Sequence, residues 1–307
     1  MIIDAELAGV LAALSGDSNR VRFARTLRRT FDQIYDGRNT GRFRWDQLRK
    51  TEKTHFGSLV EINLQREFAF DDGLSLDYKI AGVDVDCKWS QNQGGWMLPP
   101  EAVGHICLVV TASDEQSTWS AGLVRAAEDV LNMGSNRDAK KTLNTIGRSA
   151  IQWIWHKAIL PENLLLHIDP VIVKEIMEDL KGPRLGQKRL NELFRRVTNK
   201  PIGRGVIATV AQQDDYMKRV RANGGSRGHL KSEGIVIFGD YDIHRELAAR
   251  LGLPEIGDGD SMSARLIRVD TPGAATALLD GAWYRLCAKG EEPTKPAPNL
   301  PPPKLAD

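Results

Sequence analysis

Residues 58–89 read SLVEINLQREFAFDDGLSLDYKIAGVDVDCKW, and the second half of this stretch predicts a β-hairpin. One strand is expected over residues 76–80, a tight turn at Ala81-Gly82, and a second strand over residues 83–89, where apolar and polar residues alternate. The apolar face that we expect to be core carries Val83, Val85, Cys87 and Trp89. The opposite face carries Asp84, Asp86 and Lys88.

Asp77, Asp86 and Lys88 form the pattern D-x8-D-x-K across this hairpin. Hydrolysis of a phosphodiester needs oxygen ligands that hold Mg²⁺, and an ammonium group that orients water and stabilises the extra charge on phosphorus. The pattern therefore predicts a metal-dependent nuclease core in which the two carboxylates bind the ion and the lysine assists the attack.

A plainer interpretation of the same face stays open at this point. Two acids and a lysine on an exposed strand can form a solvated ion pair that contributes only ~0.2–1 kcal/mol. Upstream, Ser58 and Glu61 have the spacing of a capping box, so a helix is expected to begin at Gly57-Ser58 and Glu61 has a structural role available.

Three segments of the chain strongly resemble the NaeI restriction endonuclease family: KTEKTHFGSLVEINLQREF (50–68), DYKIAGVDVDCKWSQ (77–91) and GGWMLPPEAVGHICLVV (94–110). The resemblance extends from about Phe31 to past Gly252 and thus covers most of the chain. It implies a homodimeric, Mg²⁺-dependent type II restriction enzyme of the IIE kind, which binds a second copy of its double-stranded DNA site to be activated. It also suggests a GC-rich palindrome such as GCCGGC.

Carried over position by position, the resemblance places catalytic roles on Glu61, Asp77, Asp86 and Lys88. The first three of these residues would be the metal ligands, and Asp84 stays outside the set. The implied fold is α/β, with a restriction-endonuclease-like (PD-(D/E)XK) mixed-sheet core and N-terminal helices.

The composition sets bounds on the class of protein. With 307 residues the chain can form two domains, and 41% hydrophobic and 27% charged residues are ordinary for a soluble protein. There is no apolar run of membrane-spanning length, and Asp4 and Glu6 argue against a signal peptide, so we expect a cytoplasmic protein without a membrane partner. Three widely spaced cysteines predict neither disulfides nor a zinc site.

Residues 1–160 are expected to form the endonuclease domain. Helices are predicted before residue 48, a loop over 90–100, a strand buried on both sides over 105–112, and helices over 123–131 and 139–157. The loop SQNQGGWMLPP carries amides and Trp96, which we expect to be exposed, and it suits either base reading or a plain connection. Residues 34–37 look like the KYDG motif of DNA ligases, but Ile34 replaces the nucleophilic lysine, which excludes nucleotidyl transfer there.

A linker is expected over residues 161–170, followed by a second domain over 171–290. Between Lys181 and Lys231 there are thirteen Lys or Arg residues and three acids, a balance that favours contact with phosphates. Helices over 187–197 and 203–211, a basic helix over 214–222 and a strand over 234–239 fit a winged helix-turn-helix. The expected DNA contacts are Lys218, Arg219, Arg221, Arg227 and Lys231.

The resemblance implies that this second domain is related in fold to the DNA-binding domain of catabolite activator protein and holds the activating DNA. The tail, residues 291–307, contains six of the fourteen prolines and is expected to be disordered or extended. The alternative to a restriction enzyme is a DNA-binding regulator whose nuclease fold is inactive.

Overall fold

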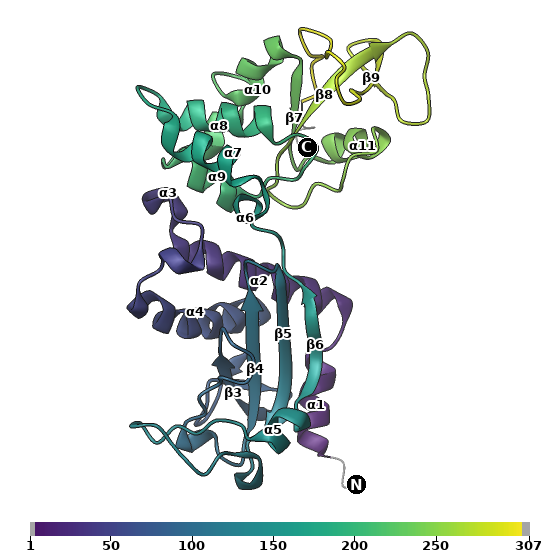
Figure 1. Cartoon of the computed structure of the whole chain (residues 1–307). Helices are drawn as coiled ribbons and strands as arrows, with labels where there is room; N and C mark the ends of the chain where they lie inside the picture. The colour runs from purple at the N-terminus through teal and green to yellow at the C-terminus, as the bar shows by residue number, and fades with distance from the viewer. Residues whose placement is uncertain (1–3, 303–307) are drawn as a thin grey trace. The chain divides into compact units, whose positions relative to one another are not determined.

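A computed structural model describes residues 4–302, and the chain divides into two compact units (Figure 1). The first unit contains the residues up to 35 together with 44–162, and the second contains 36–43 together with the residues from 163 onward. The short segment 36–43 therefore belongs to the second unit, although the residues before and after it belong to the first. No helix within residues 4–302 is both long enough and apolar enough to cross a membrane.

A six-stranded mixed sheet forms the centre of the first unit, with its strands in sequence order. The strands are β1 (Asp71–Asp72), β2 (Tyr78–Ile80), β3 (Val83–Trp89), β4 (Ile106–Ser113), β5 (Thr118–Arg125) and β6 (Gln152–Ile159). β3 and β4 pair in parallel, and every other neighbouring pair is antiparallel. The predicted mixed sheet is confirmed.

Three long helices cover one face of this sheet: α1 (Ala5–Leu14), α2 (Asp17–Tyr35) and α4 (Lys50–Phe68). Phe23 and Leu27 of α2 and Phe56 of α4 are completely buried together with Leu108 of β4. These side chains recur at helical spacing, so burial of one apolar stripe on each helix stabilises this layer. The predicted N-terminal helices are confirmed.

The opposite face of the sheet is covered by loops and short helices: η2 (Pro100–Ala102), η3 (Glu128–Val130) and α5 (Thr145–Ala150). A second, smaller core lies here, in which Cys107 and Val109 of β4 contact the layer that contains Trp96. Alternate residues of β4 thus enter two different cores, as expected for a strand that is buried on both sides.

Three local predictions in this unit were wrong in whole or in part. Residues 123–131 and 139–157 were expected to be helical, but they contain the end of β5 and most of β6, and the α-helical part of the second range is α5, Thr145–Ala150. β5 pairs with β4 along its whole length, and such long-range pairing overrides a helical spacing of apolar residues. Trp96 is 1% exposed and its Nε1 donates to the carbonyl of Val110, so it is a core residue and not an exposed one.

Helices form the first part of the second unit: α3 (Gly37–Thr40), α6 (Leu164–His167), α7 (Pro170–Lys174), η4 (Glu175–Asp179), α8 (Leu185–Arg196), α9 (Arg204–Ala211), η5 (Tyr216–Val220), α10 (Ser226–His229) and η6 (Leu230–Glu233). Leu190 and Phe194 of α8 pack with Ile207 and Val210 of α9 in a common core. The predicted helices over 187–197 and 203–211 are confirmed, whereas the basic helix over 214–222 is reduced to the short 3-10 helix η5.

A four-stranded antiparallel sheet forms the rest of this unit, in the order β7-β8-β10-β9. Its elements are β7 (Ile235–Phe238), β8 (Met262–Val269), β9 (Ala277–Leu279) and β10 (Ala282–Leu286), and α11 (Asp242–Arg250) packs beside them. The strand predicted over 234–239 is confirmed as β7.

The proline-rich tail was expected to be disordered or extended, and up to residue 302 it is extended and packed against the second unit. Ala297 is 2% exposed, and its N–H donates to the carbonyl of Lys231. The N–H of Thr294 donates to Leu266 of β8. The segment 291–302 therefore closes part of the core between α11 and the four-stranded sheet, and residues 303–307 lie outside the described residues.

Candidate active site and nucleic-acid surface

The β2–β3 hairpin presents the predicted site residues on one face of the first unit's sheet. Ala81 and Gly82 both have positive φ angles, 50° and 81°, which is the turn geometry that matches the twist of a two-residue hairpin. Val85 and Cys87 are buried in the core beneath the helices. Because side chains alternate along a strand, Asp86 and Lys88 lie on the opposite face, as predicted.

Asp86 is the most buried acid of the hairpin, with 3% of its side chain exposed. Its Oδ1 accepts a hydrogen bond from Lys88 Nζ at 2.6 Å. Its Oδ2 is buried and has no hydrogen-bond partner within residues 4–302. Burial raises the pKa of the Asp86 carboxyl, and the ammonium of Lys88 opposes that rise. Leaving a buried acceptor unsatisfied costs about 1–3 kcal/mol, so this oxygen needs an explanation outside packing.

Asp77 connects the two strands of the hairpin. Its Oδ2 accepts from the backbone N–H of Cys87 at 2.7 Å and from Lys88 Nζ at 3.2 Å. Lys88 therefore lies between two carboxylates. Burial lowers the pKa of Lys88, but the charges of Asp86 and Asp77 outweigh it and raise this pKa above its usual value. The lysine is protonated at neutral pH.

Glu61 reaches the same charged cluster from helix α4. Burial raises the pKa of Glu61, Asp77 and Asp86 raise it further, and Lys88 opposes them. The hydroxyl of Tyr78 in β2 donates to the carbonyl oxygen of Glu61 at 2.7 Å and thereby ties this turn of the helix to the hairpin. The four residues named from the sequence thus act on one another electrostatically.

The expected capping box at Ser58 and Glu61 was wrong. Helix α4 begins at Lys50, and the side chain of Glu52 accepts from the backbone N–H of Arg49 at its start. Glu61 therefore lies in the middle of a 19-residue helix and has no capping role.

Asp84 has a structural role in the loop before the hairpin. Its carboxylate accepts from the backbone N–H groups of Leu74 and Ser75 at 3.0 and 3.1 Å. The hydrogen bond from Leu74 is the largest cause of the lowered pKa of Asp84. Asp84 therefore orders residues 74–75 and is half-buried, whereas Asp86 is buried.

In this site the ammonium of Lys88 lies between the carboxylates of Asp77 and Asp86. Within residues 4–302, no group of three His, Cys, Asp or Glu side chains is already arranged to hold a metal. The cysteines add no nucleophile there: burial raises the pKa of Cys87 to about 12, and Cys107 is also fully buried.

A second buried ion cluster lies in the same unit, and sequence reasoning missed it. Arg28 of α2 pairs with Asp114, which follows β4, and with Asp32 at 2.9 Å. The hydroxyl of Tyr35 donates to Asp114 Oδ2 at 2.8 Å. The ligase-like segment 34–37 is therefore structural here, since Ile34 is also part of the core.

The five expected DNA contacts of the second unit fall into two groups. Lys218 and Arg221 are exposed. By contrast, Arg219 pairs with Asp215 at 3.1 Å, Arg227 Nε donates to the carbonyl of Ile237 at 2.8 Å, and Lys231 Nζ donates to Asn299. The last three residues are thus engaged in contacts within the unit.

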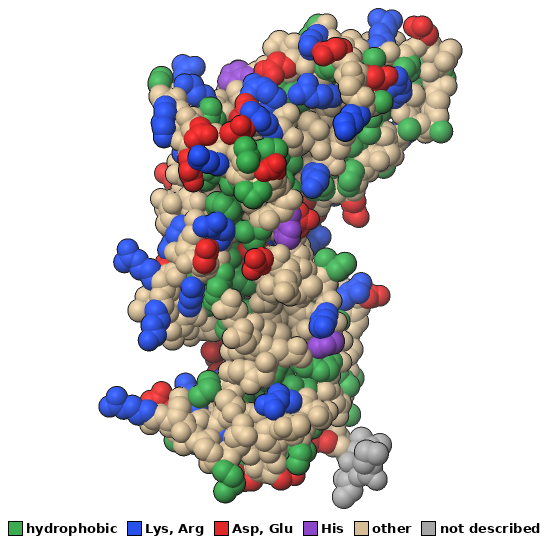
Figure 2. Space-filling model, viewed as in Figure 1, with side chains coloured by type: hydrophobic (Ala, Val, Ile, Leu, Met, Phe, Trp, Pro, Cys, Tyr) green, Lys and Arg blue, Asp and Glu red, His purple; other side chains and the backbone are tan. Residues whose placement is uncertain are grey.

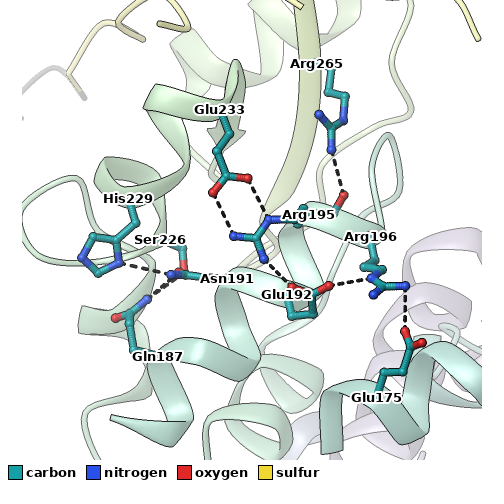
Figure 3. A network of polar contacts seen from close by, with 10 residues as sticks. All are labelled: Glu175, Gln187, Asn191, Glu192, Arg195, Arg196, Ser226, His229, Glu233 and Arg265. Carbon is teal, nitrogen blue, oxygen red and sulfur yellow. Dashed lines mark hydrogen bonds and ion pairs between the residues drawn. The ribbon is translucent and has the colours of Figure 1, made fainter. Parts of the chain in front are cut away.

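The local excess of positive charge is also smaller in the folded unit than in the sequence. Arg195 pairs with Glu192 and with Glu233 (2.7 Å), and Arg196 pairs with Glu192 (2.5 Å) and Glu175 (2.6 Å) (Figure 3). Glu175 and Glu233 lie outside the basic stretch 181–231, so a count along the chain misses them. Figure 2 shows Lys and Arg interspersed with Asp and Glu over the visible face of this unit.

Comparison with known proteins gives two matches that cover nearly all of the chain. A family model described as "Restriction endonuclease NaeI" matches residues 9–296. The chain is also 50% identical over 303 residues to a protein of Lentzea aerocolonigenes named "Type II restriction enzyme NaeI", across 97% of this chain and 95% of that protein.

Proposed function

The chain belongs to the NaeI restriction endonuclease family and is a type II restriction endonuclease that acts on DNA, and we propose that its β2–β3 hairpin hydrolyses the phosphodiester bond with bound Mg²⁺. The proposed catalytic residues are Glu61, Asp77, Asp86 and Lys88. The observation that carries the proposal is the buried Oδ2 of Asp86, which has no hydrogen-bond partner among residues 4–302 and lies beside a protonated lysine.

The donor set of the hairpin fits a hard divalent cation. Mg²⁺ prefers carboxylate oxygens, and we propose Asp77 and Asp86 as its ligands, with Glu61 as the third acid. Bound Mg²⁺ would lower the pKa of a coordinated water and stabilise negative charge on the phosphate oxygens. A cation would also give Asp86 Oδ2 the partner that it lacks among the described residues.

Lys88 supplies the positive charge that does not depend on the metal. Its ammonium remains protonated because Asp77 and Asp86 raise its pKa. A fixed ammonium beside the scissile phosphate orients the attacking water and stabilises the charge that develops in the transition state. Loss of this interaction slows the chemical step more than it weakens DNA binding.

Digestion of mapped DNA by the purified full-length chain tests the proposal. We expect a fixed set of fragments in the presence of Mg²⁺ and intact DNA when EDTA replaces the metal. If DNA binds but stays intact in Mg²⁺, the protein is a DNA-binding regulator with an inactive nuclease fold. A fragment pattern that survives EDTA would contradict the metal dependence.

We further propose a homodimer that cuts a palindromic, GC-rich site. One hairpin cuts one strand, so a double-strand break at one site requires two subunits related by a twofold axis. Sedimentation of the DNA-free chain should give the mass of two chains. The mass of a single chain would contradict the dimer.

The domain assignment is part of the same proposal: residues 1–160 as endonuclease, 161–170 as linker, and 171–290 as a winged-helix domain that binds activating DNA. The order α8, α9, η5 and β7 supports it, as do the exposed Lys218 and Arg221. Cleavage of a one-site plasmid should therefore accelerate when an oligonucleotide with the site is added. An unchanged rate would contradict activation by a second DNA copy.

A further inference from the structure

A narrow arm, residues 132–142, projects from the first unit between η3 and α5 (Figure 1). The arm is a defined hairpin. The backbone N–H of Asn132 donates to Thr142 at 2.9 Å, and that of Asn136 donates to Lys140 at 3.0 Å. The Oδ1 of Asn136 accepts from the N–H groups of Asp138 (3.0 Å) and Lys140 (2.9 Å) and fixes the tip.

The base of the arm is anchored in a core. Leu131 and Leu143, which flank the arm, pair with each other and are 4% and 0% exposed. Lys141 exchanges two backbone hydrogen bonds, 2.8 and 2.9 Å, with Leu98. Leu98 is itself 1% exposed. These two hydrogen bonds therefore attach the base of the arm to the buried part of the unit.

This attachment places the arm on the catalytic face of the sheet. Leu98, Leu131 and Leu143 belong to the core that includes Cys107 and Val109 of β4. The same two residues pair in register with Asp86 and Lys88 of β3, and residues in register point to the same face of a sheet. The arm therefore arises from the layer that covers the face carrying the proposed catalytic side chains.

The side chains of the arm suit a DNA groove. Residues 132–139 are all exposed, and Met133 is 99% exposed. Arg137 lies at the tip and has no ion-pair partner within residues 4–302. Arginine is the residue that most often contacts the guanine edge in the major groove, and methionine is among the apolar residues that contact or separate base steps.

We propose that residues 132–142 are a DNA-reading arm for the substrate site, in which Arg137 contacts a base edge and Met133 packs against the neighbouring base step. The inference rests on the proposed function, since it needs a DNA duplex at the β2–β3 hairpin. It adds specificity residues far along the chain from the catalytic set. The arm's backbone bonds hold these side chains away from the body, where a groove can receive them.

Binding measurements with the full-length chain test this proposal. Dissociation constants are measured by fluorescence anisotropy in EDTA, for a duplex carrying the site mapped by digestion and for a scrambled duplex of equal composition. Arg137→Ala should weaken binding to the mapped site by about tenfold to a hundredfold, the range for loss of a bidentate base contact. Binding to the scrambled duplex should change much less.

Three further variants sharpen the test. Arg137→Lys keeps the charge but loses the planar fork, so we expect it to discriminate poorly as well. Met133→Ala should give a smaller loss in the same direction. Arg20→Ala is the matched control, because Arg20 is an exposed arginine on α2, in the layer that covers the other face of the sheet. It should behave as the wild type.

The outcomes separate the arm from the catalytic proposal. If the wild-type protein cuts DNA and Arg137→Ala leaves both dissociation constants unchanged, the arm does not contact DNA. Equal weakening on both duplexes would mean a phosphate contact and would overturn base reading. A wild-type protein that neither binds nor cuts the mapped site would instead overturn the function on which the arm depends.

Discussion

Two buried clusters of the first unit contain nearly the same charged groups but differ in how completely those groups are hydrogen-bonded. In one, Arg28 lies between Asp32 and Asp114, and Tyr35 donates to Asp114. In the other, Lys88 lies between Asp77 and Asp86. Each cluster thus combines one cation with two carboxylates.

The difference between the clusters is in the polar atoms that remain. Both carboxylate oxygens of Asp114 are hydrogen-bonded, to Arg28 and Tyr35. The Oδ2 of Asp86 is equally buried but has no partner within residues 4–302. A fully satisfied cluster stabilises the fold, whereas an unsatisfied one retains capacity to bind something else. Residue types alone do not distinguish structure from function here.

The largest effect should come from substitutions in the Lys88 cluster, and it should be a loss of the DNA cleavage rate. We expect Lys88→Met and Asp86→Asn each to slow cleavage by ~10³-fold or more, the scale on which transition-state stabilisers act. DNA binding should persist because neither group is needed to position the phosphate backbone. Plasmid cleavage and anisotropy, measured on the same preparations, give the two values.

The control for these variants is Asp84→Asn in the same strand. The new amide oxygen can still accept from Leu74 and Ser75, so cleavage should stay close to the wild-type rate. A loss of binding that parallels the loss of cleavage in the Lys88 or Asp86 variants would point to misfolding and would remove the distinction between the clusters.

The next effect should come from the satisfied cluster and should appear in stability. Asp114→Ala removes one partner of a buried ion pair and should lower the free energy of unfolding by about 3–5 kcal/mol. Asp32→Ala should cost less, because 37% of the Asp32 side chain is exposed. Urea denaturation checks both. If Asp114→Ala unfolds like the wild type, this cluster is not structural.

A smaller effect concerns pH and the metal-free protein. Burial raises the pKa of Asp86, so the folded state keeps a proton that the unfolded chain loses above about pH 3.9. The contribution of Asp86 to stability is therefore greatest below that pH and falls as pH rises through the folded pKa. Relative to the wild type, Asp86→Asn should gain stability as pH rises from about 4 to 7. If the difference in free energy of unfolding between Asp86→Asn and the wild type stays constant from about pH 4 to 7, the raised pKa of Asp86 is wrong.

The hairpin could be predicted from sequence because its signals are local. Strict alternation over residues 83–89 and a turn whose residues adopt positive φ define both strands and both faces. β5 and β6 could not be predicted in the same way. Their identity depends on pairing with β4 and with each other, and apolar runs of that length fit either a helix or a strand.

The start of α4 shows how packing overrides a local motif. The helix continues through Gly57 and Ser58 because Phe56 and Val60 on either side are completely buried. The ion pair between Arg28 and Asp114 could not be predicted from sequence either, because 86 positions separate the two residues. The proposed catalytic residues were named through the family resemblance, and the spacing alone left a solvated strand face as an alternative.

The central claim is that the acids of the β2–β3 hairpin hold a divalent cation. Calorimetric titration of the DNA-free protein with Mn²⁺ tests it most directly, because it does not depend on cleavage. The wild type should bind the ion, and Asp86→Asn should lose most of that affinity while Asp84→Asn retains it. Equal Mn²⁺ binding by the wild type and by Asp86→Asn would contradict the claim.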